Sequence, residues 1–124
     1  MSPLLVRDVM TIGVPVCRDT EPAGAVAARL ASQLPVVVVL DDDGMACGWA
    51  TRQGLLDNAF RLVGDVMDED VPTVGPEIPA EVAAQIMRDK GVEYLFLMHD
   101  WPGEPRPSAV IARRTIEERL RVNA

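Results

Sequence analysis

The chain has 124 residues, of which 48% are hydrophobic and 25% charged, and its formal net charge is −7. This composition is typical of one globular domain of ordinary size and excludes a disordered chain. The acidic balance excludes general nucleic-acid binding and attachment to anionic membranes, since both need clustered basic residues. No stretch approaches the roughly 20 apolar residues of a membrane span, and Met1–Arg7 is too short for a signal peptide, so the sequence predicts a cytoplasmic protein.

The sequence is a tandem repeat with an offset of 57 residues, because Asp8–Met10 returns as Asp65–Met67. Each copy continues with Val-Pro, an Ala-rich helical stretch and an aliphatic run. A repeat of this length is one supersecondary unit used twice, and such a unit needs its twin to bury its apolar face. We therefore predict repeats over residues 1–62 and 63–124 that together form one module, with any function lying between the copies.

The first repeat is predicted to fold as β-α-β-β-α. Thr20 is a suitable N-cap residue, and Pro22 is tolerated in the helical turn that follows it. The run Val36–Leu40 is short, continuous and β-branched, which is typical of a buried strand. The predicted elements are, in order, an extended segment 14–17, a helix 20–30, a strand 36–40, a turn 41–44, a return strand 45–50 and a helix 51–62.

The second repeat follows the same order. Apolar residues at helical spacing from Ile78 to Met87 mark a helix, and Gly91 is expected to end it. Residues 99–108 contain three prolines and are predicted to be a loop, four residues longer than its counterpart. The predicted elements are an extended segment 71–74, the helix that Gly91 ends, a strand 94–98, a return strand 109–111 and a last helix that contains Ile116 and Leu120.

No catalytic constellation can be assembled from these residues, so the sequence predicts a protein that is not an enzyme. The single histidine, His99, has no nucleophile beside it. Cys17 and Cys47 lie in apolar contexts without metal-ligand spacing and are expected to be reduced thiols, buried in the core. Two acidic runs, Asp41–Asp43 and Asp65–Asp70, contain the ligands of a hard cation, but they lack EF-hand spacing. Solvated turns are therefore favoured and no metal site is predicted.

The turn from the return strand into the last helix carries arginine in both repeats. Arg52 follows Thr51 in the first repeat, and Arg113 and Arg114 precede Thr115 in the second. Arginine opposes the dipole of a helix N-terminus, which suggests that these side chains face an anion such as phosphate. The alternative is that they pair with surface Asp and Glu. Thr51 is also a suitable N-cap, and Thr115 opens a Thr-x-x-Glu capping box.

In order, spacing and duplication, these pieces resemble a tandem pair of CBS domains, the regulatory modules named after cystathionine β-synthase. The resemblance rests on Asp8–Thr11, the two Val-Pro pairs, the aliphatic strands and the Gly-x-x-Thr turn at Gly48–Thr51. It implies an α/β fold of two β-α-β-β-α repeats about a pseudo-twofold axis, and pairing of chains as a homodimer. It also implies clefts between repeats that bind AMP, ADP, ATP or S-adenosylmethionine as regulatory ligands, with no cofactor. The turns and the resemblance together give these candidate ligand-binding residues: Val14, Thr51, Arg52, Gly54, Val71, Thr73, Arg113, Arg114 and Thr115.

The resemblance breaks at the position where the family turn, Gly-h-h-Thr/Ser-x-x-Asp, holds ribose hydroxyls with its Asp. That position is Gly54 in the first repeat and Thr115 in the second, where Ala112 also replaces the Thr/Ser. Losing such contacts costs roughly a few kcal/mol, or about two decades in affinity. The leading hypothesis is a non-catalytic sensor of an adenosyl nucleotide or related anionic ligand that acts on a protein target. The alternative is a structural dimerisation or protein-interaction module with degenerate ligand sites.

Overall fold

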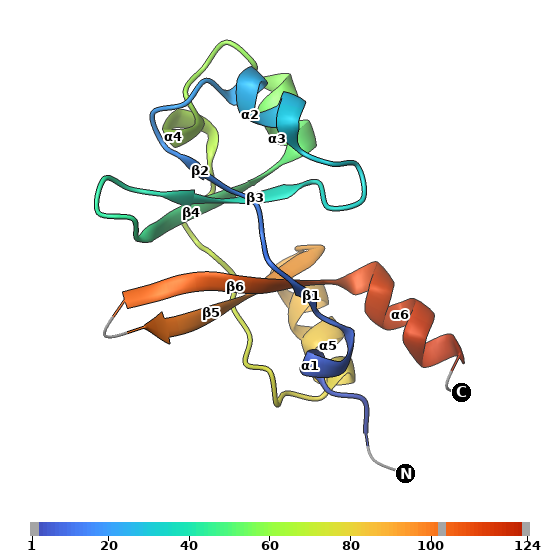
Figure 1. The fold of residues 1–124 in the computed structure, drawn as a ribbon. Coiled ribbons are helices and arrows are strands. Elements are labelled where there is room, and N and C mark those ends of the chain that lie inside the picture. The colour runs from blue at the N-terminus through green and yellow to red at the C-terminus, as the bar shows by residue number, and fades with distance from the viewer. Residues whose placement is uncertain (1–2, 102–103, 123–124) are drawn as a thin grey trace. The chain divides into compact units, whose positions relative to one another are not determined.

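The computed structural model describes residues 3–101 and 104–122 as an α/β fold with two three-stranded sheets (Figure 1). Among these residues, no helix combines the length and the apolar character needed to cross a membrane. The helices are α1 (Val6–Val9), α2 (Ala23–Arg29), α3 (Arg52–Asp57), α4 (Val63–Val66), α5 (Ala80–Lys90) and α6 (Arg113–Val122). The strands are β1 (Thr11–Ile12), β2 (Val16–Arg18), β3 (Val36–Leu40), β4 (Ala46–Thr51), β5 (Tyr94–Trp101) and β6 (Glu104–Ala112).

The described residues divide into two compact units, each with its own sheet and core. The first-repeat unit contains those within Val14–Val71 and Asp100–Arg106. The second-repeat unit contains those within Met1–Gly13, Pro72–His99 and Pro107–Ala124. Each unit is described by itself below.

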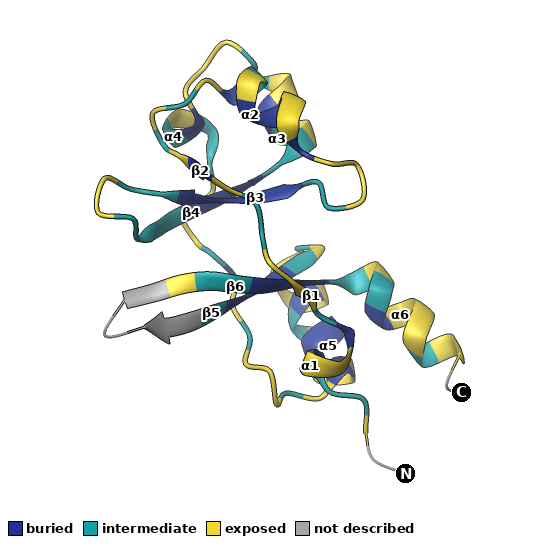
Figure 2. Ribbon diagram, viewed as in Figure 1, coloured by how far each residue is buried: buried dark blue, intermediate teal, exposed yellow. Residues whose placement is uncertain are grey.

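In the first-repeat unit, β3 is the central strand, parallel to β2 and antiparallel to β4. Residues Val36–Val39 of β3 are all fully buried, as the continuous β-branched run predicts (Figure 2). Helices α2 and α3 pack on this sheet, and Val26 and Leu55 are fully buried in the core that forms there. The aliphatic composition of the sequence is therefore sufficient to build a dry core in this unit.

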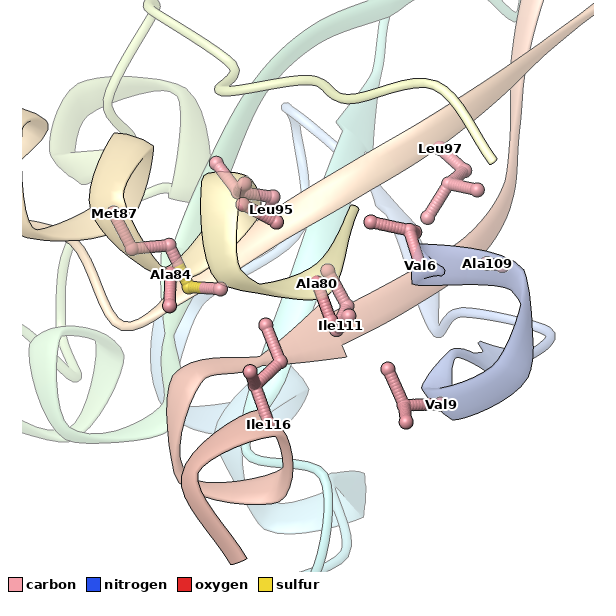
Figure 3. Packing of buried hydrophobic residues seen from close by; sticks show 11 residues of the cluster. Val6, Val9, Ala80, Ala84, Met87, Leu95, Leu97, Ala109, Ile111 and Ile116 are labelled. Atoms are coloured by element: carbon pink, nitrogen blue, oxygen red, sulfur yellow. The ribbon is translucent and has the colours of Figure 1, made fainter. Parts of the chain in front are cut away.

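In the second-repeat unit the strand order is β1-β6-β5, and β1 runs antiparallel to β6. Helices α1, α5 and α6 contribute apolar side chains to one cluster with the strands (Figure 3). Met87 of α5 and Ile116 of α6 are fully buried in it, and so is Val6 of α1. The last helix therefore faces inward through Ile116, as predicted.

The opening segment of the second repeat completes the first-repeat unit. The N–H of Ala23, the first residue of α2, donates to the carbonyl of Arg61 at 2.8 Å. The N–H of Val63, the first residue of α4, donates to the carbonyl of Glu21 at 2.9 Å. Residues 61–66 therefore belong structurally with the body of the first repeat.

The opening segment of the first repeat completes the second-repeat unit in the same way. Ala80 N–H donates to the Leu4 carbonyl at 2.7 Å, and Val6 N–H donates to the Ile78 carbonyl at 2.8 Å. These residues stand at the same 57-residue offset as the four that join the other unit. The two repeats thus exchange their opening segments, and both units are assembled across the repeat boundary that the sequence predicts between residues 62 and 63.

Hydrogen bonds between the start of α2 and residues 59 and 61 of the same repeat explain why two predicted helix boundaries are wrong. Helix α2 begins at Ala23 and not after Thr20, and its N-cap residue, Pro22, makes no side-chain cap. The free N–H groups of its first turn are satisfied instead by backbone carbonyls, which removes the need for a capping side chain. Helix α3 ends at Asp57, five residues before the predicted Leu62, because the carbonyls of Ala59 and Arg61 accept hydrogen bonds from α2.

The prediction of a loop over residues 99–108 is also wrong, because most of these residues belong to strands. Strand β5 continues to Trp101 and β6 starts at Glu104, so the described residues leave only 102–103 between them. Pro105 and Pro107 therefore lie inside β6. Strand β1 pairs with β6 only at Ala109 and Val110, so the missing N–H groups of these prolines cost no hydrogen bond in the ladder with β1.

Other local predictions are confirmed. Strand β3 spans Val36–Leu40 as predicted, and Gly91 ends α5 in the left-handed conformation with φ of 68°. A side chain at such a φ is strained, so glycine is the natural residue there. The Val92 N–H donates to the Met87 carbonyl at 2.9 Å and closes the helix end.

Candidate functional site

The strand-to-helix turn of the first-repeat unit joins β4 to α3. Thr51 is the N-cap residue of α3, and its hydroxyl oxygen accepts a hydrogen bond from the Gly54 N–H at 3.1 Å. The Arg52 N–H donates to the Pro35 carbonyl at 2.8 Å. The capping role predicted for Thr51 is therefore confirmed, and its hydroxyl hydrogen is left to donate elsewhere.

A cavity of about 170 Å³ opens beside this turn. All of its lining comes from the first-repeat unit: Trp49, Ala50, Thr51, Gly54, Val66 and Asp68. Drug-sized ligands occupy pockets of about 300–1,000 Å³, so this cavity holds one part of a ligand of that size. Of the candidate residues from the sequence, the structure brings Thr51 and Gly54 together here.

Asp68 lines this cavity although the sequence analysis placed it in the acidic run Asp65–Asp70, interpreted as a solvated turn, and not among the candidate ligand-binding residues. Its backbone pairs with Trp49 through two hydrogen bonds of 2.9 Å, which fixes the segment after α4 beside β4. The Trp49 indole N–H donates to the Asp70 carbonyl at 3.1 Å and holds the same segment. One signal in the sequence could have found Asp68, since it stands where the first repeat has Thr11.

Gly48 permits the close approach of this segment to β4. A Cβ atom at Gly48 would lie 2.5 Å from the Sδ atom of Met67 and 2.9 Å from the Asp68 carbonyl oxygen. Both distances are shorter than real Cβ contacts, so no side chain fits at this position without movement of the backbone. Glycine is therefore required here by packing, which gives the Gly-x-x-Thr turn a structural reason.

The remaining candidates in this unit lie outside the lining of the cavity. The Nε atom of Arg52 is buried and makes no hydrogen bond within the described residues. Val14 and Val71 are half-buried residues at the two ends of Val14–Val71, and neither belongs to a strand. A role for these three residues in ligand binding stays a prediction.

In the corresponding turn of the second-repeat unit, the first arginine forms ion pairs. Arg113 pairs with Glu93 at 3.0 Å and with Glu117, one helical turn along α6, at 3.5 Å. The structure thus contains the ion pairs that the sequence analysis offered as the alternative for this arginine. Arg114 is exposed at the next position of α6. Thr73 is exposed and forms a parallel bridge with Phe96.

Thr115 does not open a capping box. Helix α6 begins at Arg113, so Thr115 is its third residue and lies inside the first turn. The residue that corresponds to Thr51 is Ala112, which has no hydroxyl, and the Arg113 N–H donates to the Glu93 carbonyl at 2.9 Å. A backbone carbonyl from another part of the chain again serves one of the N–H groups of a helix start.

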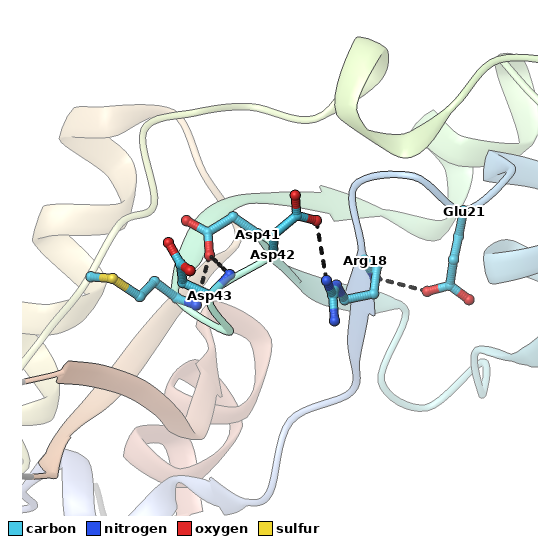
Figure 4. A network of polar contacts seen from close by, with 6 residues as sticks. Arg18, Glu21, Asp41, Asp42 and Asp43 are labelled. Carbon is cyan, nitrogen blue, oxygen red and sulfur yellow. Dashed lines mark hydrogen bonds and ion pairs between the residues drawn. The ribbon is translucent and has the colours of Figure 1, made fainter.

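The acidic run Asp41–Asp43 forms a turn with internal hydrogen bonds (Figure 4). The Oδ1 atom of Asp41 accepts from the N–H groups of Asp43 and Met45 at 2.9 and 3.0 Å. Asp42 pairs with Arg18 at 3.2 Å. Within the described residues, no three His, Cys, Asp or Glu side chains gather as they would around a metal ion.

Beside this turn, Glu21 is held by two arginines. The Arg29 guanidinium donates to its carboxylate at 2.8 and 3.1 Å, and the Arg18 N–H donates at 2.7 Å. Because of these bonds, with that of Arg29 the larger cause, the pKa of Glu21 is lowered. This exposed network connects β2 to the start and end of α2 and serves structure.

Both cysteines are free thiols. Burial, and next the charge of Glu21, raise the pKa of Cys17 from 9.0 to about 11. Burial also raises the pKa of Cys47, which is only half-buried. A thiol with a raised pKa is a poor nucleophile, because the thiolate is the reactive form.

A family model for the CBS domain matches residues 6–60 and 63–116. Comparison with curated protein sequences gives no match.

Several solved structures superpose on nearly the whole chain. The CBS domain pair of protein MJ0100, in complex with 5′-methylthioadenosine and S-adenosyl-L-methionine, gives a TM-score of 0.85 at 15% identity over 99% of this chain and 100% of that chain. CBSX2 in complex with AMP gives 0.73 at 18% identity over 98% and 99%. The soluble part of a magnesium transporter gives 0.74 at 18% identity over 97% of this chain and 48% of that chain, so the chain spans about half of that structure. At these identities the likeness establishes the fold.

Proposed function

Because the chain belongs to the CBS domain family through both of its repeats, we propose that it is a non-catalytic regulatory module that binds an adenosyl ligand. The family match covers residues 6–60 and 63–116, and two similar structures were solved with adenosyl compounds. The module would act on a protein target, and we expect it to do so as a cytoplasmic homodimer.

The observation that carries this proposal is the cavity at the β4–α3 turn. Its lining includes Trp49, Thr51 and Asp68, residues whose side chains are an aromatic ring, a hydroxyl and a carboxylate. An apolar wall with a few convergent polar groups is the usual composition of a small-molecule site. The backbone around it is held firmly, by the Thr51 cap on one side and by the Trp49–Asp68 pairing on the other.

A sensor of this kind works by a shift of populations. A ligand that binds one conformation better than another favours the first by the difference in its binding free energies. The opening segment 63–71 lines the cavity through Val66 and Asp68, and its first residue, Val63, donates to the carbonyl of Glu21, just before α2. Ligand contact with this segment would therefore be transmitted to α2 through the backbone.

The proposal is tested by a thermal-shift screen of the full chain against adenosine, AMP, ADP, ATP and S-adenosylmethionine. A ligand at about 100 times its Kd should stabilise the fold by about 2.7 kcal/mol, a shift of several degrees. Arg52→Ala is expected to reduce the shift if this arginine assists binding. Arg113→Ala is the matched control, since Arg113 already pairs with Glu93 and Glu117. The proposal is wrong if none of these compounds shifts the Tm at millimolar concentration.

A dimerisation or protein-interaction module is the second candidate function. Two observations favour it: the second-repeat turn is occupied by ion pairs of Arg113, and Phe60 is fully exposed. Leu56 and Leu62, close to Phe60 in the chain, are 39% and 47% exposed. An exposed aromatic with aliphatic neighbours is typical of an interface. Phe60→Ser should then dissociate the dimer in sedimentation experiments without lowering the Tm of the monomer, and an unchanged mass would count against this candidate.

A further inference from the structure

We propose that Asp68 is a ligand-binding residue and that, with Thr51, it makes the cavity selective for the hydroxyl groups of a ribonucleoside without phosphate. This inference rests on the proposed function, because it names the chemical class of the ligand at the same site. Neither the family match nor the similar structures assign a role to Asp68.

The first step concerns hydrogen-bonding capacity. The Thr51 oxygen already accepts from the Gly54 N–H, so its remaining capacity is chiefly as a donor. The Oδ1 atom of Asp68 accepts from the Asp70 N–H at 2.9 Å, and its Oδ2 atom makes no hydrogen bond within the described residues. Two residues of the cavity lining, Thr51 and Asp68, therefore have one donor and one charged acceptor left to offer. A vicinal diol, whose hydroxyls both donate and accept, satisfies this pair, whereas an apolar group or a pure acceptor does not.

The second step concerns rigidity. Two backbone hydrogen bonds of 2.9 Å fix Asp68 against Trp49, and the bond from Asp70 N–H holds its carboxylate. Gly54 adds no side chain to the cavity lining, and a Cβ there would lie 3.3 Å from the Thr51 oxygen. A preorganised acceptor loses little freedom on binding, which favours affinity.

The third step concerns charge. Asp68 is followed by Glu69 and Asp70 and preceded by Asp65, and this whole acidic segment lines a second, adjoining hollow of about 690 Å³. Arg52, the arginine of this turn, is not part of the cavity lining. Like charges repel one another over about 8 Å at physiological salt before screening becomes strong. A phosphate at this site would meet carboxylates, so an uncharged nucleoside or a cationic one such as a sulfonium is preferred to AMP or ATP.

The test is isothermal titration of the full chain with adenosine, 2′-deoxyadenosine and AMP. Asp68→Asn removes the charge but keeps the Oδ1 atom that accepts from Asp70, so the turn is retained. Glu69→Gln is the matched control, because it removes one charge from the next residue, which does not line the cavity. The Tm of both variants is measured first to show that the fold is intact.

The wild-type chain should bind adenosine more tightly than either 2′-deoxyadenosine or AMP. Asp68→Asn should weaken adenosine binding by roughly 10- to 100-fold, as expected for a hydrogen bond to a charged group, and should remove the preference over 2′-deoxyadenosine. Glu69→Gln should change adenosine binding by less than about threefold, as expected for a screened surface charge.

Two results would overturn the role of Asp68 while leaving the proposed function in place. One is adenosine binding that Asp68→Asn leaves unchanged, or weakens no more than Glu69→Gln does. The other is tighter binding of AMP than of adenosine by the wild-type chain. Failure of every adenosyl compound to bind, S-adenosylmethionine included, would refute the proposed function and this inference together.

Discussion

Gly48→Ala should destabilise the protein although it adds a single methyl group. The new Cβ would lie 2.5 Å from the Met67 Sδ atom, which a side-chain rotation can relieve. It would also lie 2.9 Å from the Asp68 carbonyl oxygen, which belongs to the backbone and cannot rotate away. Ordinary contacts begin at 3.4 Å, so the segment at Asp68 must retreat by about half an ångström.

The cost follows from the hydrogen bonds that this retreat weakens. Trp49 and Asp68 exchange two backbone bonds of 2.9 Å, and the retreat would lengthen both toward the limit of a hydrogen bond. At about 0.5–1.5 kcal/mol for each bond, the loss is about 1–3 kcal/mol. For a chain of this size, about 4 °C of Tm corresponds to each kcal/mol, so Gly48→Ala should melt about 4–12 °C below the wild type.

The assay is thermal unfolding followed by circular dichroism, with Gly75→Ala as the matched control. A Cβ at Gly75 would meet only Ile78, at 3.9 Å, so this substitution should stay within about 0.5 kcal/mol of the wild type. A Gly48→Ala protein that melts within about 2 °C of the wild type would refute the packing argument, given the scale used here. An equal loss in Gly75→Ala would do the same, since the effect would then come from glycine replacement in general.

Two further predictions follow. Val6→Ala and Val63→Ala each trim a fully buried side chain of an exchanged opening segment, so each should lower the free energy of unfolding in urea by about 2 kcal/mol. The control Val82→Ala trims a half-exposed side chain and should lower it only slightly. An unchanged free energy of unfolding in Val6→Ala or Val63→Ala would contradict the reciprocal exchange. Because burial raises the pKa of the Cys17 thiol to about 11 from 9.0, its contribution to stability is fully present below pH 9 and is lost as the pH rises toward 11. Cys17→Ala should therefore flatten the fall of the urea midpoint over that range, and an equally steep fall in the variant would show that Cys17 is not responsible.

Much of this protein can be determined from the sequence by itself. The duplication predicted two similar units, the β-branched run predicted β3, and Gly91 predicted the end of α5. The hydroxyl of Thr51 predicted the cap of α3. These features depend on neighbours within a few residues, such as burial periodicity, a left-handed φ or a side chain that reaches its own helix, so local chemistry is sufficient to specify them.

Only the tertiary structure decided which parts of the chain complete one another. The first turn of α2 is satisfied by carbonyls of Ala59 and Arg61, which lie more than 30 residues away, so Thr20 is not needed as a cap and α3 ends early. A second pairing, between Trp49 and Asp68, brings Asp68 into the same cavity lining as Thr51, whereas the sequence predicted only a solvated turn for its acidic run. A buried N–H must find an acceptor, but the sequence does not record which distant carbonyl provides it, and that choice sets the exchange of opening segments and the composition of the site.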